Sequence, residues 1–105
     1  MAQNHHKAIA IAKKYIAHLR ENNITVDRAY LYGSYANGKP HKDSNIDIVV
    51  VSKQFRKSRF EESVKIAKLR REIDLRISPL AYHPKDFIED NIIPNEAMNH
   101  GIRIA

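Results

Sequence analysis

The segment LYGSYANGKPHKDSNIDIVVV, residues 31–51, decides which strands this chain forms and where its polar residues gather. The pair Gly33-Ser34 closes a stretch in which small or apolar residues alternate with tyrosines. About ten mainly polar residues then lead to Asn45-Ile46-Asp47, which opens a β-branched run. Such a run predicts a buried strand over residues 46–52. We therefore expect two strands that are joined through a glycine turn and a polar loop.

The rest of the chain predicts helices and strands in alternation, from apolar residues at helical or strand spacing. In chain order, the expected elements are a helix over residues 5–22, a strand over 26–34, a helical turn over 34–38, a strand over 46–52, a helix over 56–71, a strand over 73–78 and short helices around 84–90 and 94–100. Pro79 should end the third strand or confine it to a sheet edge. Because residues 37–45 are short for a full crossover, the sheet should be mixed. We expect an α/β (α+β) fold, a small mixed sheet packed with helices, in a single domain over residues 1–105.

The composition is that of a globular chain with excess positive charge. Eighteen Lys and Arg against twelve Asp and Glu give a net charge of +6, which favours phosphate-bearing or acidic partners, although scattered lysines also serve solubility. Cysteine is absent, so disulfides and thiolate metal sites are excluded. No apolar run approaches the roughly 18 residues that span a bilayer, and no signal peptide opens the chain. We expect a cytoplasmic protein without a membrane partner.

The Gly33-Ser34 turn is a candidate phosphate site. A glycine at the end of a strand, followed by a serine that opens a helix, leaves backbone N–H groups directed at one point. Gly33 lets a phosphate approach the main chain because it has no Cβ. Ser34 caps the helix or turns its hydroxyl toward a phosphate oxygen. By itself, a Gly-Ser pair is most often a plain turn.

Oxygen-bearing side chains on the following strands are candidate metal ligands. Asn45 and Asp47 share one face of their strand, since side chains alternate along it. Asp74 is central in the third expected strand and is also directed away from the core. If this strand lies beside the second, Asp47 and Asp74 converge on one ion. Carboxylates together with phosphate oxygens and water are the ligands that Mg²⁺ favours.

With these residues the chain resembles the minimal nucleotidyltransferases of the DNA polymerase beta superfamily, which include the antitoxins of HEPN/MNT pairs. That family carries Gly-Ser on a strand-to-helix turn, about ten loop residues, Asp-x-Asp on the next strand and a third acid on a later one. Gly33-Ser34, Asp47 and Asp74 match this motif, and Asn45 stands where the first Asp of the pair belongs. The resemblance covers residues 26–79 and implies the nucleotidyltransferase fold.

The resemblance implies transfer of a nucleoside monophosphate, usually AMP from ATP, with release of pyrophosphate. In family terms, Gly33-Ser34 holds the outer phosphates, and Asp47 and Asp74 bind two Mg²⁺ ions if the site is fully active. Asp74 also helps to deprotonate the acceptor hydroxyl. Lys39 and Lys42 in the loop are further phosphate-binding candidates, with solvated loop lysines as the alternative. The implied partners are an NTP and either a HEPN-type helical toxin, adenylylated on a tyrosine, or a second copy of the chain.

Asn45 sets this chain apart from the family motif. Its amide oxygen is a weak, neutral metal ligand, so the site holds two formal negative charges in place of three. Asp43 in the loop is a possible substitute, although a turn with Ser44 explains it equally well. Three hypotheses follow: a magnesium-dependent transferase weakened by Asn45, a degenerate relative that binds a nucleotide or a partner without transfer, and a basic nucleic-acid-binding module. The last lacks a recognition helix or an aromatic stacking platform, which disfavours a nucleic-acid partner.

Overall fold

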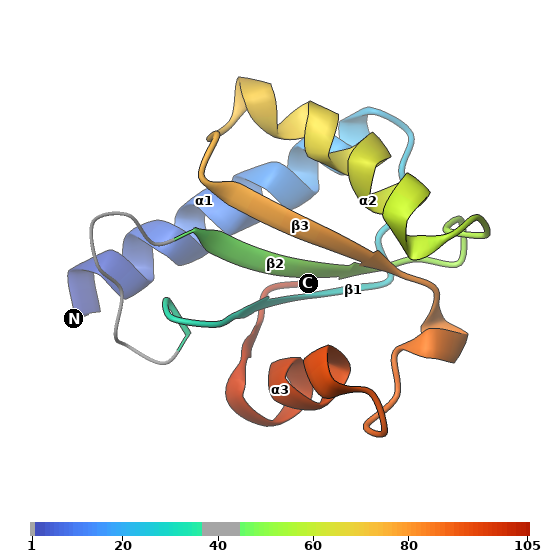
Figure 1. Cartoon of the computed structure of the whole chain (residues 1–105). Helices are drawn as coiled ribbons and strands as arrows, with labels where there is room; N and C mark the ends of the chain where they lie inside the picture. Colours follow the sequence, from blue (N-terminus) through green and yellow to red (C-terminus); the bar gives the residue numbers. More distant parts are fainter. Residues whose placement is uncertain (1, 37–44) are drawn as a thin grey trace.

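The structure is a computed structural model that describes residues 2–36 and 45–105. It contains four strands, three α-helices and two 3₁₀ helices within these residues (Figure 1). In chain order they are α1 (Ala2–Glu21), β1 (Arg28–Tyr32), β2 (Ile46–Val51), α2 (Arg59–Ala67), η1 (Lys68–Glu72), β3 (Ile77–Tyr82), η2 (Pro84–Asp86), α3 (Ile92–His100) and β4 (Ile102–Arg103). The α+β class predicted from the sequence is confirmed.

The sheet has the strand order β3-β2-β1-β4 and is mixed, as predicted. Strands β1 and β2 are antiparallel, with Tyr32 opposite Asp47. Strands β2 and β3 are parallel, with Asp47 opposite Ser78. The β-branched residues of β2 are buried on both faces because this strand lies between two neighbours and under helices on each side. The second expected strand is therefore confirmed almost residue for residue.

Helix α1 confirms the first expected helix and ends at the predicted place. Asn23 has a φ of 67°, in the left-handed region that asparagine tolerates better than most residues. The N–H of Ile24 donates to the carbonyl of Leu19, and the N–H of Asn23 donates to that of Arg20. This pair of hydrogen bonds is the Schellman arrangement, which satisfies the last carbonyls of a helix and turns the chain toward the sheet.

Helices cover both faces of the sheet (Figure 1). On one face, α1 and α2 enclose a core that includes Leu31, Ile48 and Ile77, and the hydroxyl of Tyr15 in α1 donates to the carbonyl of Ile66 in α2 at 2.6 Å. On the other face, η2 and α3 cover a second core that is rich in aromatic residues: Tyr30, Tyr32, Val49, Val51, Tyr82, Phe87 and Ala97. Asp47 belongs to this second face, because it alternates with the buried Ile46 and Ile48 of the first.

The third strand differs from the prediction. It was expected over residues 73–78, but β3 covers Ile77–Tyr82, and Asp74 lies in the turn before it. The alternation of apolar residues continues through this turn, where the backbone N–H of Arg76 donates to Asp74 and the N–H of Ile77 donates to the Asp74 carbonyl. These local hydrogen bonds hold the residues in a turn despite their strand-like pattern. Pro79 lies inside β3, which is an edge strand, so the predicted edge position is correct.

Helix α3 ends at His100, the predicted end of the last helix, and Gly101 follows as its C-cap. The N–H of Gly101 donates to the Ala97 carbonyl, and a Cβ at Gly101 would lie only 2.8 Å from the backbone oxygen of Leu31. Glycine therefore lets α3 approach the end of β1 and allows β4 to join the sheet beside β1.

In the part of the chain that the structure describes, none of the helices has the length and apolar character that crossing a bilayer requires.

Candidate active site

The Gly33 turn packs directly against the carboxylate of Asp47. Gly33 follows the last residue of β1 and has a φ of 76°, a conformation that favours glycine. A Cβ at this position would lie 2.5 Å from Oδ2 of Asp47, closer than atoms can approach. The turn therefore favours glycine, and any larger residue would also have to displace the Asp47 carboxylate. The Gly33 turn and Asp47, which the polar loop separates in the sequence, therefore meet at one point.

A methyl group at Gly33 is expected to disturb the fold and the site together. Gly33→Ala should lower the stability by about 1–2 kcal/mol because alanine is strained at this φ, and it should displace the Asp47 side chain. Urea unfolding measures the first effect. Unchanged stability in Gly33→Ala would contradict the strained backbone conformation at residue 33.

Asp47 lies in an electrostatic environment that opposes its ionisation. Burial, and secondarily the negative charge of Glu96 in α3, raise the pKa of the Asp47 carboxyl above its ordinary value. The pKa of the neighbouring Tyr32 hydroxyl is also raised, first by burial and then by Asp47. Asp47 and Glu96 thus bring two acidic side chains together under α3, with the neutral Tyr32 hydroxyl beside them. A group with this electrostatic character stabilises a cation or a ligand that carries one.

The sequence did not identify Glu96 or Tyr32 as site residues. Glu96 lies in a short tail helix, and its sequence neighbours give no indication of what that helix covers. Tyr32 has the same face as Asp47, but the strand pattern by itself does not separate a site tyrosine from a core tyrosine. Only the packing of α3 across β1, together with the antiparallel register of β1 and β2, brings these residues to Asp47.

Asp74 is held in the turn by Arg76. Its Oδ1 accepts from the backbone N–H and Nε of Arg76, and its Oδ2 accepts from Nη2 at 2.9 Å. These hydrogen bonds from Arg76 lower the pKa of the Asp74 carboxyl. The expectation that Asp74 occupies a strand is wrong. Its convergence with Asp47 on one ion stays a prediction, and it would require that Asp74 exchange its contacts with Arg76 for the ion.

The Asp74–Arg76 pair should stabilise the fold in a pH-dependent way. Since the folded-state pKa of Asp74 is lowered, the stabilisation is complete above the unfolded pKa of about 3.9 and disappears as the pH falls through the folded value. We expect Asp74→Ala to lose about 1 kcal/mol at pH 7, because Arg76 is half exposed and solvent screens the pair. Urea unfolding should show this loss at neutral pH and a smaller one in acid.

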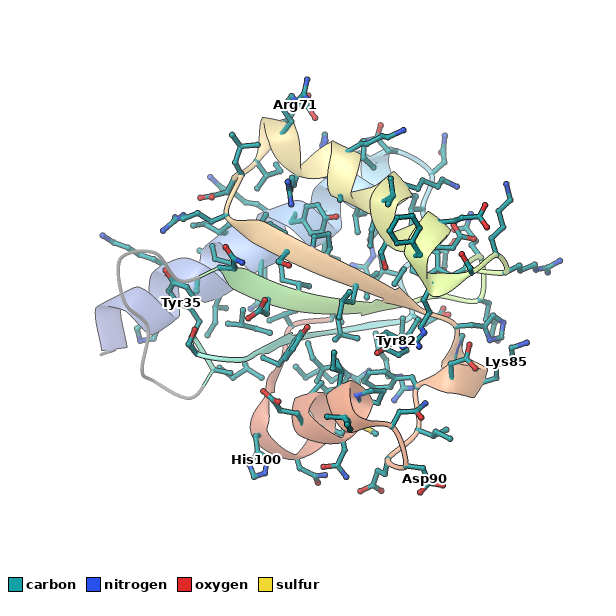
Figure 2. The ribbon with its side chains drawn as sticks, viewed as in Figure 1. Tyr35, Arg71, Tyr82, Lys85, Asp90 and His100 are labelled. Atoms are coloured by element: carbon teal, nitrogen blue, oxygen red, sulfur yellow. The ribbon has the colours of Figure 1, made fainter. Side chains whose placement is uncertain are left out.

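The matched control for this prediction is Asp90→Ala. Asp90 is exposed and lies in the connection before α3, where Figure 2 shows it on the opposite side of the sheet from α2. Its removal should leave stability unchanged at both pH values. A loss of stability in Asp74→Ala that is equal at neutral and acid pH would contradict an ionic origin.

The remaining predicted site residues are placed as follows. Ser34 lies in the turn formed by residues 33–36, and the rest of the expected helical turn over residues 34–38 lies outside the described residues. Asn45 is exposed and immediately precedes β2, two positions from Asp47. Lys39, Lys42 and the possible substitute Asp43 lie outside the described residues.

A divalent cation fits this site through Asp47 in combination with the oxygens of a bound nucleotide. The described residues contain no group of three His, Cys, Asp or Glu side chains that would hold a metal ion unaided. Mg²⁺ is usually bound by one or two carboxylates together with substrate phosphates and water. A cation beside Asp47 would also favour the ionised carboxylate that burial and Glu96 disfavour. Asp47, with the Asn45 amide nearby, therefore suits a magnesium ion that arrives with a nucleotide.

Comparisons with known proteins gave a matching family model and a related protein. The model of the nucleotidyltransferase domain family matches residues 12–104. A predicted protein adenylyltransferase of Methanocaldococcus jannaschii is 31% identical over 83 residues, which cover 75% of this chain and 79% of that protein.

Two solved structures share the fold. A crystal structure of a predicted nucleotidyltransferase of Sulfolobus solfataricus superposes with a TM-score of 0.69 at 15% identity, covering 97% of this chain and 83% of that one. A chain from a mutant of the toxin–antitoxin complex MntA–HpeT superposes with a TM-score of 0.57 at 23% identity, covering 88% of this chain and 70% of that one. At these identities the similarity establishes the arrangement of the elements.

Proposed function

We propose, since the chain belongs to the nucleotidyltransferase domain family, that it transfers AMP from ATP to a hydroxyl group of a protein with the help of magnesium. The observation that carries the proposal is the contact between the Gly33 turn and the Asp47 carboxylate. This contact puts the backbone of a turn that can bind a phosphate beside an acid that can hold a phosphate-bound cation. The M. jannaschii relative, whose name assigns it protein adenylylation, supports the choice of reaction.

The proposed reaction is an in-line displacement at phosphorus. The acceptor hydroxyl oxygen forms a bond to the α-phosphorus of ATP while the bond to the bridging oxygen of the β-phosphate breaks. Pyrophosphate leaves, and the hydroxyl proton passes to a carboxylate or to solvent, a role that the family resemblance gives to Asp74. Bound magnesium would supply charge stabilisation on the α-phosphate and the leaving group. In the proposal, Gly33-Ser34 orients the outer phosphates and Asp47 holds the phosphate-bound cation.

The experiment is a labelling assay in the presence of magnesium. Label from ATP marked at the α-phosphate should become attached to a protein acceptor, and label at the γ-phosphate should not. The proposed acceptor is a HEPN-type toxin encoded beside this chain, by analogy with the toxin–antitoxin complex that shares the fold. EDTA should abolish the attachment. Transfer of the γ-label would indicate a kinase, and the proposal would fail.

A second candidate is nucleotide or partner binding without transfer. It is favoured by the neutral Asn45 and by the engagement of both Asp74 oxygens with Arg76. Under this alternative, isothermal titration should detect binding of ATP or of the partner protein, while the labelling assay shows no transfer. In both cases we propose a cytoplasmic antitoxin-like role, with the HEPN-type protein as its partner.

A further inference from the structure

We propose that the solvent-facing side of α2 and η1 is a docking surface for an amphipathic, acidic helix of a partner protein. The surface, here called the apolar–basic strip, consists of three apolar residues, Phe60, Val64 and Leu75, flanked by three basic ones, Arg59, Lys68 and Arg71. It lies on α2 and the segment that follows, whereas Asp47 faces α3 on the other side of the sheet. The proposal therefore does not depend on transfer of a nucleotide.

The apolar residues of the strip are exposed although helical spacing suggests a core. Phe60 and Val64 are one helical turn apart, and their side chains are 77% and 40% exposed. Leu75, in the turn after η1, is 69% exposed and lines the same hollow as Val64. The helix buries a different line, which includes Ile66 and Glu62. Exposed apolar residues scattered singly are ordinary, but three on one strip indicate a binding surface.

Two shallow hollows follow the strip. The first, of about 270 Å³, lies between α2, β3 and α3 and includes Arg59, Phe60, Leu80 and Ile93 in its lining. The second, of about 260 Å³, lies along the end of α2 and η1, and its lining includes three basic residues: Lys68, Arg70 and Arg71. Neither lining contains an acidic residue. Apolar side chains of a partner can enter the hollows while its acidic groups meet the basic residues.

The acidic residues of the same segment are engaged elsewhere. Glu61 interacts with the Ser58 hydroxyl at the start of α2. Glu62 is buried and accepts from the backbone N–H of Lys57. Glu72 is 3.4 Å from His18 in α1. Among the described residues, no ion pair involves Arg59, Lys68 or Arg71, and Figure 2 shows Arg71 projecting away from the sheet. Arg59 donates from Nη1 to the Tyr82 hydroxyl at 2.9 Å and lies over the Tyr82 ring, a neutral contact that leaves its charge uncompensated. The charges of Lys68 and Arg71 are available to an acidic partner.

The neighbouring edge of the sheet excludes docking by strand addition. Along β3, the outward backbone groups belong to alternate residues from Ile77 to Ala81. Nη1 of Arg70 donates to the Ile77 carbonyl at 2.9 Å, Pro79 has no N–H, and the N–H of Ala81 donates to Oγ of Ser63 at 2.8 Å. An added strand would find few free groups to pair with. A partner must therefore bind through side chains, and a helix with one apolar line matches the spacing of Phe60 and Val64.

The test uses a synthetic helical peptide with leucine on one face and glutamate on the other, labelled for fluorescence anisotropy. We expect the peptide to bind and Phe60→Ser to weaken binding about tenfold, the effect of losing a central apolar contact. The matched control is Ile92→Ser in α3, which removes a residue that is 85% exposed but lies outside the strip. This control should leave the affinity unchanged. Arg71→Glu should also weaken binding and reduce its dependence on salt.

Several outcomes would overturn the proposal. The peptide could fail to bind at millimolar concentration, a lysine version could bind equally well, or Ile92→Ser could weaken binding as much as Phe60→Ser. If a single-stranded oligonucleotide binds, and if Arg71→Glu abolishes this binding while Phe60→Ser does not, the strip is a nucleic-acid site. If sedimentation shows that this chain forms a dimer, and Phe60→Ser dissociates that dimer, the strip binds a second copy of the chain. Circular dichroism of each variant separates these results from unfolding, since all the substituted residues are exposed.

Discussion

Asp47→Asn is expected to abolish nucleotide transfer while making the protein more stable at neutral pH. The carboxylate is the charged group of the proposed site that lies against the Gly33 turn, so its loss should reduce the rate at least about 100-fold. The same carboxylate is partly buried near Glu96, and asparagine has no charge to desolvate there. The melting temperature should rise by a few degrees, as expected for a small domain. The labelling assay and thermal unfolding at pH 7 measure the two effects.

The pH dependence of this gain in stability follows from the raised pKa. Because the folded state disfavours the ionised Asp47, the native protein carries a penalty above the folded pKa that Asp47→Asn lacks. Below the unfolded value of about 3.9, the carboxyl is neutral in both states and the difference should vanish. Asp90→Asn, which changes an exposed acid, should alter neither activity nor stability. If Asp47→Asn lowers the stability at neutral pH, the carboxylate has a stabilising partner and the electrostatic account of the site is wrong.

The elements that the sequence predicted well are those in which burial and periodicity agree. Helix α1 buries one continuous line of residues, and its end is fixed by Asn23, which adopts the left-handed conformation. Strand β2 is buried on both faces, so its unbroken β-branched run has one interpretation. The glycine of the turn is predictable for a different reason: Gly33 has a backbone conformation that other residues avoid.

One prediction failed, the strand at Asp74, and the sequence left two features of the structure unseen, the exposure of Phe60 and the position of Glu96. The pattern around Asp74 is that of a strand, but its hydrogen bonds with Arg76 form a turn. Phe60 has the helical spacing of a core residue, yet the sheet packs against another side of α2. Glu96 reaches the site only because α3 crosses β1. The turn at Asp74 comes from local hydrogen bonds. The exposure of Phe60 and the position of Glu96 were decided by tertiary packing, which local periodicity does not contain.

Asn45→Asp is expected to raise the transfer rate by about 100-fold and to strengthen magnesium binding. The site as it stands has one carboxylate against the Gly33 turn, and Asp74 is occupied by Arg76. An acid at residue 45 would add a charged oxygen two positions from Asp47 and on the same face of the chain. A second charged ligand should better offset the charge that develops on the transferred phosphate, and electrostatic contributions of this kind are worth about 10²–10³ in rate. Titration with Mg²⁺ in the presence of ATP measures the affinity, and the labelling assay measures the rate.

The control for the added charge is Asn95→Asp, which makes the same chemical change at an exposed position of α3. It should leave magnesium affinity and transfer unchanged. If Asn45→Asp increases magnesium affinity but no transfer follows, a missing charge is not what limits the site, and the contacts of Asp74 with Arg76 become the limiting feature. Arg76→Gln in the Asn45→Asp background then frees the Asp74 carboxylate. Transfer that appears only in this double variant would identify Arg76 as the residue that keeps Asp74 away from the reaction.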